Sequence, residues 1–237
     1  MAISPGDPTT STIELARTLR PQGFGPRSVK KIADPVVEPQ WAGIRVIASA
    51  QDGIAALFDD GDAVPHDEVS RALGATLWRT TESAILDGYL TKQAHPQEIP
   101  VATGLEEAPS STELFTQTFF GLKLGKRAAE TRRREAEARA SYIRPDDRVT
   151  LLATDLLYLD GTWLLDVPLL ERRRLLESVL PGDELVRPGP YVRPPIDSWL
   201  TSWRAQGFTG ITFKDANSRY VPGGTAMEWA TAPMPSR

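Results

Sequence analysis

Hydrophobic and polar positions alternate along this chain of 237 residues in ways that predict short strands and amphipathic helices. The VVEPQWAGIRVIASA stretch over 36–50 predicts two strands joined at a tight Trp41-Ala42-Gly43 turn, and an Asp52-Gly53 turn then predicts a hairpin with a strand over 54–58. Apolar spacing of the helical period predicts further helices over 13–19, 66–77, 168–180 and 196–206. Apolar runs bounded by turn residues predict strands over 84–90, 148–161, 184–186, 191–192 and 208–215.

The remaining segments are more polar. Residues 1–12 are expected to form a flexible tail, and residues 94–111 an exposed loop. A long helix is predicted over 112–142, with a second half that is almost wholly polar. Because hairpins, long strands and surface helices are mixed, the pattern predicts an α+β fold. We expect residues 13–237 to form a single domain.

Composition narrows the classes of protein. With 41% hydrophobic residues and a net charge of -4, the chain is expected to fold around a sizeable core. The sequence has no cysteine, so disulfides, thiolate zinc sites and cysteine nucleophiles are excluded. Its two histidines, His66 and His95, have polar neighbours and are expected at the surface. No apolar run is long enough to span a membrane and the first residues do not resemble a signal peptide, so we expect a cytoplasmic protein.

Two sequence patterns are only weak evidence for binding of a nucleotide or a nucleic acid. The GLKLGK sequence over 121–126 is one residue short of a phosphate-binding loop and lies within a helical pattern. The arginine-rich segment 126–139 has the charge to follow a nucleic-acid backbone. Glutamates are interleaved with its arginines, however, so a solvated helical face is the favoured interpretation.

Six separate segments carry a more specific signal. They are EPQWAGIR (38–45), ILDGYL (85–90), ATDLLYLDG (153–161), PLLERRRLL (168–176), TGITFKD (209–215) and SRYVPG (218–223). In this order they resemble the adenylation domain of ATP-dependent DNA ligases over about residues 34–229. The resemblance implies a ligase-type nucleotidyltransferase fold, ATP-grasp-like, in which two antiparallel sheets pack together under surface helices. It also implies ATP and magnesium as cofactors and a role in DNA repair.

The departures from that family fall on its chemistry. The position of the lysine that forms a covalent lysyl-AMP holds Gln40, and an amide nitrogen is not a useful nucleophile. Positions where the family has carboxylates hold Ala42, Tyr89 and Thr209, so candidate magnesium ligands are missing. Thr154 replaces the aromatic residue expected against adenine, and the lysines expected after Trp229 are absent. We therefore predict no catalytic residue and no metal site.

Other family positions are retained, and they allow two interpretations. A residual nucleotide pocket would place Arg45 and Lys214 on phosphate and Trp41 near the base. The favoured alternative is maintenance of the fold, with Arg45 paired to Asp87 or Asp155. The complete set of candidate nucleotide-binding residues is Glu38, Trp41, Gly43, Arg45, Asp155 and Lys214.

Three functions remain open. The first is a catalytically inactive pseudoenzyme that binds a protein partner or DNA, with an apolar patch around Phe115, Phe119 and Phe120. The second is a domain that binds ATP or AMP without covalent chemistry, which needs an open cleft between the strands of 36–48 and 208–215. The third is an active ligase that uses a partner chain and a substitute nucleophile such as Lys92. Because the chain ends at Arg237, we expect no oligonucleotide-binding (OB) barrel after the last motif. The sequence does not identify the partner or the oligomeric state.

Overall fold

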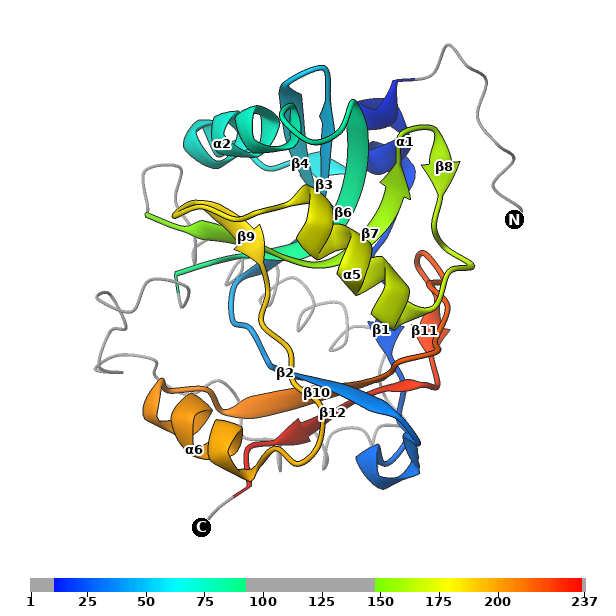
Figure 1. Cartoon of the computed structure of the whole chain (residues 1–237), viewed down its shortest axis with the longest axis vertical. Coiled ribbons are helices and arrows are strands. Elements are labelled where there is room, and N and C mark those ends of the chain that lie inside the picture. Colours follow the sequence, from blue (N-terminus) through cyan, green and yellow to red (C-terminus); the bar gives the residue numbers. More distant parts are fainter. Residues whose placement is uncertain (1–10, 93–147, 236–237) are drawn as a thin grey trace, which may run out of the picture.

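A computed structural model describes residues 11–92 and 148–235 of the chain (Figure 1). Its large sheet has the strand order β5-β4-β3-β6-β7-β8, with β9 beside β7. The small sheet has the order β12-β10-β2, and β1 pairs with β11. Neighbouring strands are antiparallel except in the β7–β9 and β1–β11 pairs. The strands are β1 Gly23–Phe24, β2 Pro35–Pro39, β3 Ile44–Gln51, β4 Ile54–Asp59, β5 Asp62–Ala63, β6 Ser83–Thr91, β7 Thr150–Leu159, β8 Thr162–Trp163, β9 Val186–Pro188, β10 Gly210–Asp215, β11 Thr225–Ala226 and β12 Trp229–Pro233.

The helices that the sequence predicts within the described residues are present. They are α1 Thr12–Thr18, α2 Asp67–Leu77, α5 Leu169–Val179 and α6 Asp197–Ala205, and a short 3₁₀ helix, η1, spans Val29–Lys31. The Ser11 hydroxyl accepts a hydrogen bond from the Glu14 N–H and so caps the first turn of α1. The predicted loop over 94–111, the predicted helix over 112–142 and most of the predicted tail lie outside the described residues.

The two strands predicted over 36–50 both form, but they belong to different sheets. β2 pairs with β10, whereas β3 pairs with β4 and β6, so the segment 40–43 links the sheets instead of closing a hairpin. Gly43 has φ of +132°, and a Cβ at this position would lie 2.0 Å from the Leu90 carbonyl oxygen. A glycine is therefore required there for both conformation and space. The β3–β4 hairpin follows the prediction.

Both faces of the large sheet are buried. Val46, Ala48 and Leu86 lie in one apolar cluster with residues of α2 and α5. On the opposite face, Ile47 and Ile85 belong to a second cluster that extends to α1 and the small sheet. This double burial explains why β7 has a nearly continuous apolar sequence instead of an alternating one. A third cluster lies between the small sheet and α6.

The expectation of a surface histidine was wrong for His66, which is buried at the N-cap position of α2. Val69 in the first turn of α2 packs on the large sheet. His66 precedes this turn directly and is therefore held close to the sheet. His95 lies outside the described residues. Among the helices of the described residues, none is long and apolar enough to cross a membrane.

Candidate ligase-type site

The candidate site begins with a buried ion pair between neighbouring strands of the small sheet. Glu38 on β2 lies opposite Thr212 on β10, and the Lys214 side chain comes from the same strand β10. The Lys214 Nζ lies 2.7 Å from Glu38 Oε2, and both side chains are almost completely buried. The ammonium group also lies 4.6 Å from the centre of the Trp229 ring. The structure therefore brings together two predicted nucleotide-binding residues, but as partners of each other.

Arg173 of α5 is a second cation beside Glu38. Its Nη1 lies 3.8 Å from Glu38 Oε1, too far for a direct hydrogen bond. The guanidinium instead donates to the carbonyl oxygens of Ala153 and Gly189 and lies over the ring of Tyr191. Glu38 Oε1 and Arg173 Nε are buried and have no hydrogen-bond partner among the described residues. One carboxylate is thus shared between two cations, which leaves this cluster with an excess of positive charge.

The Asp155 carboxylate of β7 forms an ion pair with Arg172, the second buried arginine of α5. Arg172 Nε and Nη2 lie 2.7 and 2.8 Å from the two carboxylate oxygens of Asp155, which gives a bidentate pair. Arg172 also donates to the Val167 and Ser218 carbonyl oxygens. Both partners are completely buried. This pair ties α5 to the centre of the large sheet and to the loop before β11.

Arg172 and Arg173 were not among the site residues predicted from the sequence. The periodicity of α5 predicts an apolar face, and its buried side does contain Leu169, Leu176 and Val179. The two arginines share that buried side, and their neighbour Arg174 is exposed. The sequence signal that could have revealed them is a run of three arginines that lies between two pairs of leucines. Why Arg172 and Arg173 point inward is explained only by the positions of Asp155 and Glu38 in the fold.

Arg45 of β3 pairs with Asp87 of β6, which is one of the two partners considered from the sequence. Arg45 Nε and Nη2 lie 2.9 and 2.5 Å from the carboxylate oxygens of Asp87. Burial works to lower the pKa of Arg45, but the attraction of Asp87, together with that of Tyr89 and Tyr220, outweighs it, and the pKa is raised well above its ordinary value. Arg45 Nη1 also donates to the carbonyl oxygen of Gln22 at 2.7 Å.

Tyr220 completes this second network. Its hydroxyl donates to Asp87 Oδ2 at 2.8 Å and accepts from the Gln22 N–H at 3.0 Å. Burial and the neighbouring Asp87 carboxylate raise the pKa of Tyr220 well above its ordinary value. Gln22 and Tyr220 were not among the site residues predicted from the sequence, although Tyr220 lies within the SRYVPG segment that supported the resemblance.

The residues that depart from the family pattern lie in two places, namely around the ends of β2 and β10 and on strand β6 of the large sheet. Gln40 is exposed, and its N–H donates to the Gly210 carbonyl oxygen at 2.9 Å. Its side chain lies over Gly210, where an added Cβ would come within 2.1 Å of Oε1, and the exposed Thr209 precedes that glycine. Tyr89 lies on the large sheet, with its ring centre 5.8 Å from the Arg45 guanidinium carbon. Ala42 is exposed in the link between the sheets.

Trp41 packs against apolar residues, with its Nε1 near Gly189, where an added Cβ would lie 3.9 Å from it. Its ring makes an edge contact with Phe208, with ring centres 4.9 Å apart, in the apolar cluster beneath α6. Phe213 packs against the same cluster. β2 and β10 are hydrogen-bonded neighbours in the small sheet, whereas β3, which is also part of the 36–48 region, belongs to the large sheet.

In this arrangement, the acidic and basic side chains of the site that the structure describes are engaged with one another. Within residues 11–92 and 148–235, no three acidic or histidine side chains lie close enough together to hold a metal ion. The carboxylates of Glu38, Asp87 and Asp155 all face cations of the protein. A phosphate group would have to compete with these carboxylates for Arg45 and Lys214.

The antiparallel sheets, the surface helices and the place of the six motif segments define a nucleotidyltransferase domain of the ligase type. The chain belongs to the family of ATP-dependent DNA ligase domains, because the sequence model described as "ATP dependent DNA ligase domain" matches residues 28–231. This assignment agrees with the resemblance found in the sequence.

Solved structures and curated proteins give the same relationship. The ligase domain of LigD from M. tuberculosis aligns with a TM-score of 0.61 at 25% identity, covering 92% of this chain and 60% of that chain. The mycobacterial DNA ligase D complexed with ATP and MES aligns with a TM-score of 0.59 at 25% identity, with coverages of 91% and 60%. The multifunctional non-homologous end joining protein LigD of Mycobacterium bovis is 37% identical over 84 residues, which are 35% of this chain and 11% of that protein. The chain thus spans only a part of each relative.

Proposed function

We propose that this chain is a ligase-type adenylation domain that forms no covalent lysyl-AMP and acts as a binding module for a protein partner or DNA. The observation that carries the proposal is Gln40 at the nucleophile position. Its amide nitrogen is delocalised into the carbonyl group and cannot attack a phosphate in the way that a neutral lysine amine does. The names of the mycobacterial relatives refer to non-homologous end joining, and we extend a role in DNA repair to this chain on that basis.

The electrostatics of the site support this proposal. Transferring a nucleotidyl group requires cations and metal ions aimed at the charge that develops on phosphate. Here Arg45 and Lys214 face Asp87 and Glu38 instead. Separating such buried pairs leaves an uncompensated charge, which makes their use for phosphate unfavourable.

Covalent adenylylation is the direct test. The purified chain is incubated with ATP and magnesium, and its intact mass is measured for the addition of one AMP. We expect no adduct in the wild type or in the Gln40→Lys variant, because the restored amine would still lack carboxylates at the positions of Ala42, Tyr89 and Thr209.

The first of two results would overturn the proposal, and the second would overturn only the expectation for the Gln40→Lys variant. An AMP adduct on the wild-type chain that disappears in a Lys92→Ala variant would identify an active enzyme with a substitute nucleophile. An adduct on Gln40→Lys alone would mean that one substitution accounts for the loss of activity. Gln40→Ala is the matched control, because it changes the same exposed position without adding an amine.

Non-covalent binding of ATP or AMP is the second candidate, and the excess positive charge around Glu38 favours it. The buried Nε atoms of Arg173 and Trp41 donate no hydrogen bond among the described residues, so donors for a bound group exist there. This candidate requires the Glu38–Lys214 pair to open. Saturable binding of ATP without an AMP adduct would support it over the first candidate.

A further inference from the structure

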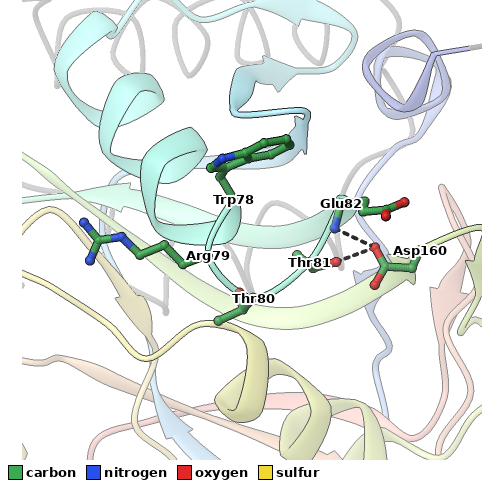
Figure 2. Close-up of a pocket in the computed structure, with 6 residues that line it drawn as sticks. All are labelled: Trp78, Arg79, Thr80, Thr81, Glu82 and Asp160. Carbon is green, nitrogen blue, oxygen red and sulfur yellow. Dashed lines mark hydrogen bonds between the residues drawn. The ribbon is translucent and has the colours of Figure 1, made fainter.

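A hollow of about 460 Å³ is formed by residues just before the start of β6 and by Asp160 (Figure 2). It is lined by Trp78, Arg79, Thr80, Thr81, Glu82 and Asp160. Ser83 opens β6 beside this hollow, and Tyr89 is six positions further along, or about 20 Å in an extended strand. None of the residues considered for nucleotide binding lines it.

Asp160 is a fixed negative charge in this hollow. Its Oδ1 accepts hydrogen bonds from the Thr81 hydroxyl at 2.5 Å and from the Glu82 N–H at 2.9 Å (Figure 2). The Ser83 N–H donates a third hydrogen bond to the same oxygen at 2.9 Å. Burial works to raise the pKa of Asp160, but these hydrogen bonds outweigh it and lower the pKa below its ordinary value. All three bonds from the described residues go to Oδ1, so within this part of the chain Oδ2 keeps its capacity to accept from a bound group.

Trp78 adds an exposed aromatic surface. The residue is 59% exposed, although a large apolar ring is normally buried. Its ring lies over Gly53, where an added Cβ would be 3.8 Å from Cγ, and the neighbouring Ile54 is 66% exposed. Figure 2 places the carboxylates of Glu82 and Asp160 on one side of the Trp78 ring, while Arg79 extends to the other side.

We propose that this hollow binds an arginine or lysine side chain of a partner protein. The aliphatic stem of that side chain would lie along the Trp78 ring, and its cationic head would pair with Glu82 and Asp160. Charge complementarity selects a basic occupant, because the two carboxylates lie together and Arg79 extends away from them. Exposed tryptophan and arginine are the residue types that most often dominate protein interfaces. The inference rests on the proposed function, since it supplies the chemistry of a partner for a binding module.

The test is a titration of the full chain with the peptide acetyl-Ala-Ala-Arg-Ala-Ala-amide, observed through the tryptophan indole N–H signals in a two-dimensional NMR spectrum. Loss of one signal in a Trp78→Phe variant assigns the Trp78 indole. We expect that signal to shift saturably with the arginine peptide, and not with a matched peptide that carries the neutral isostere citrulline. The lysine analogue should shift the same signal in the same direction.

Charge reversal locates the contact. Glu82→Lys should weaken binding of the arginine peptide about tenfold, because an attraction becomes a repulsion at an exposed position. Glu177→Lys is the matched control, since Glu177 is an exposed residue of α5 outside the hollow, and it should leave binding unchanged.

Several outcomes would overturn the inference. These are an unshifted Trp78 indole signal, equal shifts with the citrulline peptide, or equal losses of binding in the two charge reversals. A Trp78 shift that follows protein concentration without peptide would assign the surface to a second copy of the chain instead. None of these results depends on formation of an AMP adduct, so failure here leaves the proposal of an inactive adenylation domain separately testable.

Discussion

The two ends of β6 differ in how their charges are used. Near Tyr89, Arg45 and Asp87 form a pair that is closed further by Tyr220. At the start of the strand, Glu82 and Asp160 lie beside an exposed Trp78. A family resemblance directs attention to the first end, but its charged groups already have protein partners. Retained family residues can thus maintain a fold, and we propose that the surface for recognition lies at the other end of the same strand.

The same contrast predicts different sensitivities to mutation. A buried charge that loses its partner leaves an uncompensated ion in a region of low dielectric constant. An exposed charge or aromatic ring keeps its contact with water when a neighbour is removed. Substitutions at the closed end should therefore change the stability of the fold, and substitutions at the open end should change binding alone.

The largest effect is expected for Asp155→Ala. Arg172 would remain buried without a carboxylate, which should lower the free energy of unfolding by about 3–5 kcal/mol. Urea denaturation followed by circular dichroism measures the change. Arg174→Ala is the control on the next exposed position of α5 and should change stability by less than about 0.5 kcal/mol. Equal effects of the two substitutions would contradict the structural role of the Arg172–Asp155 pair.

A smaller loss is expected for Glu38→Gln. The amide keeps the size of the side chain but removes the carboxylate that, among the described residues, lies beside both Lys214 and Arg173, at a cost of about 2–3 kcal/mol. Adding Lys214→Met in the same chain should recover part of that loss, because it removes one of the two unpaired cations. Denaturation of the single and double variants gives the coupling energy. Purely additive losses would mean that Glu38 and Lys214 do not stabilise each other.

Tyr220→Phe should lower the free energy of unfolding by about 1–2 kcal/mol through the loss of its hydrogen bonds. Because the pKa of Tyr220 is raised in the folded protein, its contribution is present below the ordinary tyrosine pKa and decreases as the pH rises above about 10. The wild-type protein should therefore lose stability between neutral pH and strongly alkaline pH more steeply than the variant. Parallel stability profiles would show that Tyr220 makes no linked contribution.

The smallest effect on stability is expected for Trp78→Ala. The ring is largely exposed, so the free energy of unfolding should change by less than about 0.5 kcal/mol. The same variant should no longer bind the arginine peptide, which calorimetry can measure without the Trp78 signal. Unchanged peptide affinity in a stable Trp78→Ala protein would remove the distinction between the two ends of β6.

Much of the fold follows from local patterns in the sequence. The β3–β4 hairpin is specified by its Asp52-Gly53 turn, and Gly43 meets the need for a positive φ. The apolar run of β7 and the start of α5 after Pro168 are equally local signals. Each of these features depends on neighbours in the chain, and for that reason the sequence alone predicts them.

The remaining features depend on distant partners. Nothing within 36–50 indicates that β2 joins β10 and β12 while β3 joins the large sheet. The short strand β12 was not predicted, because WATAP has no clear alternation and forms only beside β10. The inward orientation of Arg172 and Arg173 depends on Asp155, Glu38 and carbonyl groups far away in the sequence. The candidate residues could thus be named from the sequence, but their pairing could not.

Calorimetric titration with ATP and magnesium tests the central claim most directly, namely that the retained charges of the ligase-type site are closed into internal pairs. We expect no saturable heat and no shift in the thermal unfolding midpoint. Micromolar saturable binding would contradict the account, and at a ligand concentration of 100 times Kd it would stabilise the fold by about 2.7 kcal/mol. That result would mean that Arg45 and Lys214 leave their carboxylate partners for phosphate.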